Sequence, residues 1–149
     1  MLLRACLLIA LIACAGCGDS DTSPSEPPAD LTGSWTGQIG SSMSGTAVRF
    51  TWTATQSGGT ATGPARVVKP AVGTEVPGTL TATINGNQAG FSFSAPAGSV
   101  PTLPACTASG TGSGTFGGNS ISGTFSLTAT GCATIGIESA SGAALLMTR

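Results

Sequence analysis

The chain has 149 residues, a formal net charge of −1 at pH 7 and no histidine or tyrosine. Only 7% of its residues are charged, so it offers neither a basic stripe for nucleic acid nor the acid–base pairs and ligand clusters that catalysis and metal binding use. We therefore expect a protein that is not an enzyme and that needs no metal, cofactor or nucleic-acid partner.

The N-terminal residues have the pattern of an export signal. Arg4 is the only charge before Asp19, and the apolar run at residues 5–13 is shorter than the about 20 residues that span a bilayer. This pattern predicts a signal peptide over residues 1–16. The alternative is an uncleaved N-terminal helix.

The end of that run, "LIACAGC", resembles the bacterial lipobox, in which a cysteine is diacylated and becomes the new N-terminus. Length favours Cys17 as the acylated residue, because a signal ending before Cys14 would be very short; Cys14 is the alternative. Two acyl chains give stable membrane anchoring. The resemblance implies an exported, lipid-anchored envelope protein. Gly18, in place of an Asp after the acylated residue, favours the outer membrane.

The segment after the acylated cysteine predicts a spacer. Residues 18–30, "GDSDTSPSEPPAD", combine acids and prolines with no large apolar residue, as disordered tethers do. Acylated Cys17 and this tether occupy residues 17–30. The remaining residues, 31–149, suffice for a single domain with a modest core.

The two cysteines of that domain are expected to pair. Once the signal is removed and Cys17 is acylated, only Cys106 and Cys132 remain, in an oxidising compartment. We predict a disulfide between them, worth roughly 3 kcal/mol in the loop-entropy model.

From Leu31 onward, apolar and polar residues alternate over short stretches that end at Gly, Asn or Pro. This period of two is typical of strands with one buried face, and it predicts eight strands, at residues 31–39, 47–55, 60–68, 78–84, 89–95, 107–116, 121–130 and 142–148. We expect an all-β, eight-stranded antiparallel up-and-down barrel rather than a sandwich, because closure removes both sheet edges. The last stretch is apolar on both faces, so a short helix is the alternative there; a strand would indicate a subunit contact or a nearby membrane.

Three tight turns fix the expected strand registers. A turn at Ser57-Gly58 would pair Trp52 with Gly63 and Phe50 with Ala65, so that inward residues meet inward residues. Turns at 86–87 and 118–119, both Gly-Asn, give the pairs Ile84 with Ala89, Leu80 with Phe93, Phe116 with Ile121 and Gly110 with Leu127. Extending the third hairpin places Cys106 opposite Gly131, so the disulfide needs either a bulge at Gly131 or a position in the loops beyond the strands.

The connections predict a barrel with one elaborate end. Those at residues 40–45, 69–77, 96–105 and 131–141 are long and all fall at the same end, which would be braced by the disulfide. Binding usually resides in such loops. Facing glycines and alanines are expected to leave room beside the aromatic rings, and we predict an apolar ligand site lined by Phe50, Trp52, Phe93 and Leu127. The alternative is that these side chains fill the lumen.

The first strand carries a family resemblance. "GSW" resembles the Gly-x-Trp signature of lipocalins, and Arg149 is placed like the Arg that packs across the Trp at the closed end in that superfamily. The resemblance implies that Gly33, Trp35 and Arg149 form the closed end of a barrel. "LTGSWTGQIGSS" also resembles the opening strand of avidin-type biotin binders, although Gly37 stands where that family has its biotin-contacting Asn. As a whole, the chain resembles bacterial lipocalin-like (calycin-type) lipoproteins.

These observations lead to two expectations of function. The first is a lipid-anchored envelope lipoprotein whose barrel binds a small apolar molecule at its long-loop end. The second is a non-enzymatic protein-interaction or structural module with a filled core, which would use the same loops without a cavity. The sequence identifies neither the ligand nor a protein partner.

Overall fold

The computed structural model describes residues 29–40 and 47–149. The predicted signal peptide, both candidate acylation sites and nearly all of the predicted tether lie outside these residues. Within them the chain forms eight strands and one short 3-10 helix, which are β1 (Gly33–Ile39), β2 (Val48–Ser57), β3 (Thr60–Val68), β4 (Glu75–Asn85), β5 (Gln88–Ala95), β6 (Thr107–Gly117), β7 (Ser120–Thr130), η1 (Ala133–Ile135) and β8 (Ala140–Thr148).

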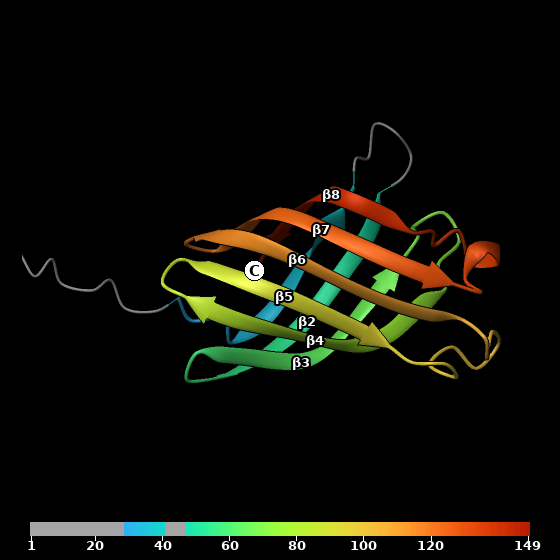
Figure 1. Ribbon diagram of the computed structural model, residues 1–149, viewed down its shortest axis with the longest axis horizontal. Helices are drawn as coiled ribbons and strands as arrows, with labels where there is room; N and C mark the ends of the chain where they lie inside the picture. The colour runs from blue at the N-terminus through green and yellow to red at the C-terminus, as the bar shows by residue number, and fades with distance from the viewer. Residues whose placement is uncertain (1–28, 41–46) are drawn as a thin grey trace, which may run out of the picture.

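The strands form a closed barrel in which each strand pairs with its neighbours in sequence (Figure 1). All pairings are antiparallel, and β1 closes the ring on β8 from Thr36 opposite Thr148 to Ile39 opposite Leu145. The predicted up-and-down barrel is confirmed, and residues 142–148 belong to a strand rather than a helix. None of the helices in the described part of the chain is long and apolar enough to span a membrane.

The alternation of side chains explains why these segments are strands. In β2, Val48, Phe50, Trp52 and Ala54 are buried, while the residues between them face outward. The inward side chains of all eight strands form one apolar cluster, to which Leu31 also belongs. No charged or polar residue among those described is buried, so the barrel interior is apolar.

The three tight turns begin with glycine. Gly58, Gly86 and Gly118 have φ of 58°, 59° and 66°, as the first central residue of a type II′ hairpin turn requires. The registers predicted for the second and third hairpins are confirmed.

The register predicted for the first hairpin is wrong by two residues. Phe50 pairs with Val67 and Trp52 with Ala65, because the turn falls at Gly58-Gly59 rather than at Ser57-Gly58. Placing glycine first puts the positive φ on the residue that tolerates it best. Every inward residue still faces an inward residue, because a slip of two preserves the faces.

The predicted disulfide joins Cys106 and Cys132, whose Cα atoms lie 4.8 Å apart. It lies just beyond the β6–β7 ladder, whose last pair is Thr107 with Thr130. Gly131 follows β7 with φ of 70°, and this left-handed conformation turns the chain so that Cys132 reaches its partner. Of the two arrangements expected for this bridge, the structure has the one outside the strands.

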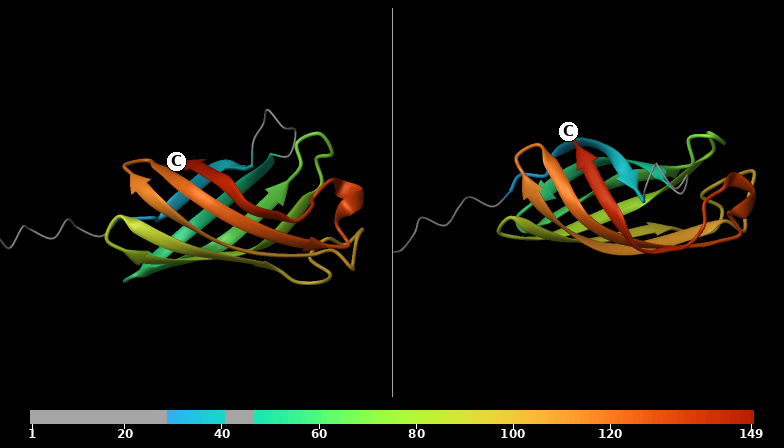
Figure 2. Two further views of the ribbon diagram at one scale, coloured as in Figure 1. Left: turned by 45° about the horizontal axis from the view of Figure 1, so that its top comes forward. Right: turned by 90° about the horizontal axis from the view of Figure 1, so that it is seen from above.

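The two ends of the barrel differ as predicted. The connections 69–74, 96–106 and 131–139 lie at one end, which we call the mouth, and the tight turns lie at the other, which we call the closed end (Figure 2). The chain enters β1 and leaves β8 at the closed end, where the backbone N–H of Arg149 donates to the carbonyl of Asn119 over 3.1 Å. Residues 41–45 of the predicted first long loop, 40–45, lie outside the described residues.

Candidate functional site

Arg149 packs and forms hydrogen bonds at the closed end of the barrel. Its guanidinium carbon lies 5.2 Å from the centre of the Trp35 ring, and its nitrogens donate to the carbonyls of Asp30 and Thr32 and to the side chain of Asn119. Trp35 is buried, and its indole Nε1 donates to the carbonyl of Leu31 over 2.8 Å. Trp35 and Arg149 therefore pack against each other at the closed end, with Gly33 (φ 131°) at the start of β1.

One carboxylate at this end is held in its charged form. The backbone N–H and the side chain of Thr32 hydrogen-bond to Asp30, and together with the nearby Arg149 they hold the pKa of this carboxyl below its ordinary value. The polar groups of the closed end are thus engaged with one another.

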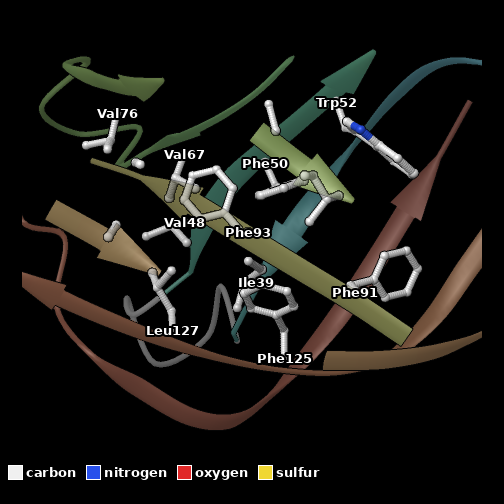
Figure 3. Close-up of a cluster of buried hydrophobic side chains, with 14 of the residues drawn as sticks. Ile39, Val48, Phe50, Trp52, Val67, Val76, Phe91, Phe93, Phe125 and Leu127 are labelled. Carbon is white, nitrogen blue, oxygen red and sulfur yellow. The ribbon is translucent and has the colours of Figure 1, made fainter. Parts of the chain in front are cut away.

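Aromatic rings occupy the middle of the barrel in two groups (Figure 3). Phe50 lies edge-on to Phe93, with ring centres 5.8 Å apart, and 6.4 Å from Phe125. Further toward the closed end, Trp52 lies edge-on to Phe91 at 6.3 Å. Such geometries are favourable for aromatic pairs, so the rings stabilise the barrel by packing on one another.

Glycines on the inner face of the barrel allow these rings to lie against the backbone. A Cβ on Gly110 or Gly112 of β6 would overlap the ring of Phe125 on the neighbouring strand, and one on Gly78 would overlap Phe93. The expectation that these glycines leave room for a ligand is therefore wrong, because the aromatic side chains already occupy that space.

Trp52 carries an unpaired polar group in this apolar interior. Among the described residues, its Nε1 is the single buried side-chain nitrogen or oxygen without a hydrogen-bond partner. A buried donor without an acceptor costs about 1–3 kcal/mol, and such groups call for a specific explanation. Only 1% of the Trp52 side chain is exposed, so bulk water does not supply that acceptor.

A pocket of about 420 Å³ opens at the mouth, a volume within the range of small-molecule sites. Its wall combines inward apolar side chains with the loop that carries η1, and it is lined by Ile39, Gly40, Val48, Lys69, Leu127, Gly136, Glu138, Ser139, Ala140 and Ala143. We call it the mouth pocket. Phe50 and Phe125 lie two residues deeper along their strands than Val48 and Leu127, so the aromatic rings lie beneath it.

An irregularity between β7 and β8 shapes this pocket. The register shifts between Phe125 and Leu127, so that Leu127 faces Ala140. Two serine side chains take the place of ladder partners: Ser126 Oγ accepts from the N–H of Gly142, and Ser139 Oγ accepts from the N–H of Ala129. Gly142 has φ of 57°, as glycine-containing bulges do. The bulge accounts for the presence of both Ala140 and Ala143 in the pocket wall.

The charged groups at the mouth are few. Lys69 and Glu138 lie in the pocket wall, and the aliphatic part of Lys69 packs beside Gly136. Glu75 instead pairs with Arg66 over 2.6 Å on the outer surface. The pocket thus has an apolar interior and one group of each sign in its wall.

The four predicted ligand-lining residues separate in the structure. Leu127 lines the mouth pocket, whereas Phe50, Trp52 and Phe93 are about 1% exposed and belong to the packed rings. Among the pocket residues that the sequence did not single out, Gly136, Glu138 and Ser139 come from the loop 131–139, and Ala140 and Ala143 come from β8. The bulge that positions them depends on serine side chains, for which the strand pattern gives no signal.

A second, more open hollow of about 460 Å³ lies on the outer wall over β1. It is lined by Thr36, Gly37, Gln38, Ala47, Val48, Arg49, Pro70, Leu146 and Thr148. Leu146 is 49% exposed, so the apolar outer face expected for β8 is present there. Since most of this hollow is formed by outward residues, the mouth pocket is the better enclosed of the two.

No group of three or more His, Cys, Asp or Glu side chains within residues 29–40 and 47–149 is arranged to hold a metal ion. No protein-family model, no curated protein and no solved structure matches this chain. The barrel and its mouth pocket are therefore the features that indicate a function.

Proposed function

We propose that this protein is a lipid-anchored envelope lipoprotein whose barrel binds a small, mainly apolar molecule in the mouth pocket. The observation that supports this proposal is the mouth pocket, because it is concave, largely apolar and placed where the long loops meet. The packed rings beneath it limit the depth of the site, so the ligand contacts Leu127, Ile39 and Val48 rather than Trp52.

The composition of the pocket wall favours an amphiphilic ligand. Leu127, Ala140 and Ala143 offer only apolar contacts, whereas Lys69 and Glu138 provide polar groups in the same wall. A ligand with an apolar body and one polar end satisfies both sets, since polar groups in such sites fix orientation while apolar contacts contribute most of the affinity.

The anchor and the mouth would face opposite ways. The lipobox-like "LIACAGC" precedes the barrel, and the barrel begins at its closed end, so acylation at Cys17 (or at Cys14) would hold that end toward the membrane. The Trp35–Arg149 pair at the closed end supports the lipocalin-like resemblance. We propose that the protein is exported and held in the outer membrane.

Native mass spectrometry tests ligand binding. The chain from Gly18 onward, exported through a cleavable signal and purified without detergent, is expected to carry an added mass of a few hundred daltons. Ala143→Phe should abolish this mass because the ring fills the mouth pocket. Ala144→Phe is the matched control, because Ala144 is the next residue of β8 and is exposed on the outer face.

Two results would contradict the proposal. One is a wild-type protein that carries no added mass and gives no fluorescence with N-phenyl-1-naphthylamine, an apolar probe. The other is an added mass that survives in Ala143→Phe, which would place the ligand elsewhere. Thermal unfolding of both variants checks that the barrel is retained.

The alternative function is a protein-interaction or structural module. The aromatic rings that fill the middle of the barrel support it, because such a module needs a stable scaffold and no cavity. Under this alternative the mouth loops bind another protein. Ala143→Phe would then leave function in cells unchanged, while substitutions on the outer side of the mouth loops would impair it.

A further inference from the structure

From Thr79 of β4 to Thr128 of β7, the outer surface of the barrel is a continuous neutral polar face; Glu75 and Pro77, at the start of β4, lie outside it. Outward residues of neighbouring strands stand opposite each other in rows. From the mouth toward the closed end these rows are Thr79–Ser94–Ser109–Thr128, Thr81–Ser92–Thr111–Ser126, Thr83–Gly90–Ser113–Thr124 and Asn85–Gln88–Thr115–Ser122. Every position except Gly90 carries a hydroxyl or a carboxamide, groups that both donate and accept hydrogen bonds. We call this surface the hydroxyl face.

No charge lies on the hydroxyl face. The charged side chains of the described residues lie elsewhere: Asp30 and Arg149 at the closed end, Lys69 and Glu138 in the mouth loops, and Arg49, Arg66 and Glu75 near the mouth-side ends of β2, β3 and β4. Polyanions such as nucleic acids, and anionic lipid surfaces, are bound mainly through Lys and Arg, so they are unsuitable partners here.

Two adjoining hollows lie in the half of the hydroxyl face that is nearer the closed end. One, of about 200 Å³, lies between Ser113, Thr115, Ser122 and Thr124, and the other, of about 160 Å³, lies between Thr83, Asn85 and Gly90. They share Gln88 and Ser113 and so form one shallow trough across four strands. Three interstrand spacings make it about 14 Å wide, the scale of a short oligosaccharide.

The trough passes over Gly90, and the fold does not require glycine at that position. Gly90 lies in the middle of β5, where glycine is less stable than a residue with a side chain. Its φ is not positive, and a Cβ built on it would meet nothing within 4 Å. Neither the backbone conformation nor the packing therefore requires glycine, and a glycine within a strand often marks the close approach of a ligand or another chain.

The barrel topology favours a ligand over an added strand from another chain as the occupant of the trough. A peptide that adds to a sheet needs a free edge, but β4–β7 each pair on both sides in the closed ring. Recognition on this face therefore falls to side-chain hydroxyls and carboxamides. We propose that the hydroxyl face binds a neutral, hydroxyl-rich glycan, with a sugar ring seated over Gly90 and held by Gln88 and Ser113.

Saturation-transfer NMR tests this proposal on the full chain as cells produce it. The protein is purified in lauryldimethylamine oxide, a detergent without a sugar headgroup. The probes are cellohexaose, maltohexaose and the hexamer of N-acetylglucosamine. At least one is expected to bind with a dissociation constant of about 1 mM, because a few solvent-exposed hydrogen bonds give weak affinity.

The variants locate the binding. Gly90→Val fills the trough and should weaken glycan binding at least tenfold. Gln88→Ala removes a proposed hydrogen-bonding side chain without changing the backbone and should also weaken binding, so it provides the test if Gly90→Val does not fold. Thr53→Val is the matched control, because it removes an exposed outward hydroxyl from β2, outside the hydroxyl face. Ala143→Phe should keep glycan binding, which separates this proposal from ligand binding at the mouth. The proposal is overturned if none of the three sugars binds, or if Gly90→Val and Gln88→Ala both bind as the wild type does.

Discussion

Two buried indoles in this barrel differ in what their N–H groups meet. Trp35 donates to the carbonyl of Leu31 and lies under the guanidinium of Arg149, so both its polar group and its ring face have a partner. Trp52 is equally buried, but its N–H has no acceptor among the described residues. The same residue type therefore has a different energetic role at each position.

We expect Trp35→Phe to destabilise the protein more than Trp52→Phe, by about 1–3 kcal/mol. Both substitutions remove the same volume, but the first leaves the buried carbonyl of Leu31 without its donor, whereas the second removes a donor that has no acceptor. Urea denaturation of the two variants measures the difference. Equal losses of stability would show that the N–H of Trp52 has an acceptor in solution.

At the scale of the strands, glycine serves two opposite purposes. On the inner face of β6, Gly110 and Gly112 allow the ring of Phe125 to lie against the backbone. On the outer face of β5, Gly90 makes no contact that a side chain would disturb. A strand rich in glycine is thus not uniformly weak, because the inner positions gain aromatic packing that larger residues would prevent.

Gly112→Ala is expected to destabilise the barrel by about 1–3 kcal/mol, because the added Cβ overlaps Phe125 and forces it aside. Gly90→Ala adds the same methyl group to open space and should be neutral or should stabilise by up to about 1 kcal/mol. The midpoints of urea unfolding provide the comparison. A loss of stability in Gly90→Ala equal to that in Gly112→Ala would contradict this account of the two faces.

The strand pattern predicted the elements well, and its one error in register has a clear cause. Alternation identifies which residues face inward, and a Gly-Asn turn fixes where a hairpin reverses, so the pairs of Leu80 with Phe93 and of Gly110 with Leu127 were predictable. In the first hairpin, Ser57, Gly58 and Gly59 offer two turns that differ by a slip of two residues. Alternation cannot separate them, but the preference for glycine at the first turn position can.

The candidate site was less predictable than the strands. Leu127 was expected to line it, but the pocket depends on a bulge held by Ser126 and Ser139, whose side chains replace backbone partners. A serine in a strand gives no sign of this role. Aromatic packing over glycines was likewise hidden, because a small residue in a sequence can indicate either free space or space filled by a neighbour.

At the scale of the whole molecule, the barrel separates its two ends. Strands of 11 residues, rising about 3.3 Å per residue and tilted by about 40°, place the mouth about 25–30 Å from the closed end. An anchor attached before Leu31 would therefore join the barrel at the end opposite the mouth pocket.

We expect Cys17→Ala to abolish incorporation of an alkyne-tagged fatty acid and to release the protein from the membrane fraction, because it removes the acylated thiol. Cys14→Ala should keep both properties. The measurement is fluorescence of the clicked label on the fractionated protein. The reverse result would identify Cys14 as the acylated residue, and label in both single variants and in the double variant would refute the lipobox interpretation.

The closing contact of the ring joins distant parts of the chain. The guanidinium of Arg149 meets the carbonyl of Asp30, 119 residues away, whereas each tight hairpin pairs neighbouring segments. Local hairpins form early and distant pairings late, because closing a long loop costs more entropy. Before closure, β1 and β8 are open edges, and neither strand carries a charged residue to discourage association. Closure of this seam therefore removes the two uncharged open edges, and any delay in closure during folding leaves them open to association with another chain.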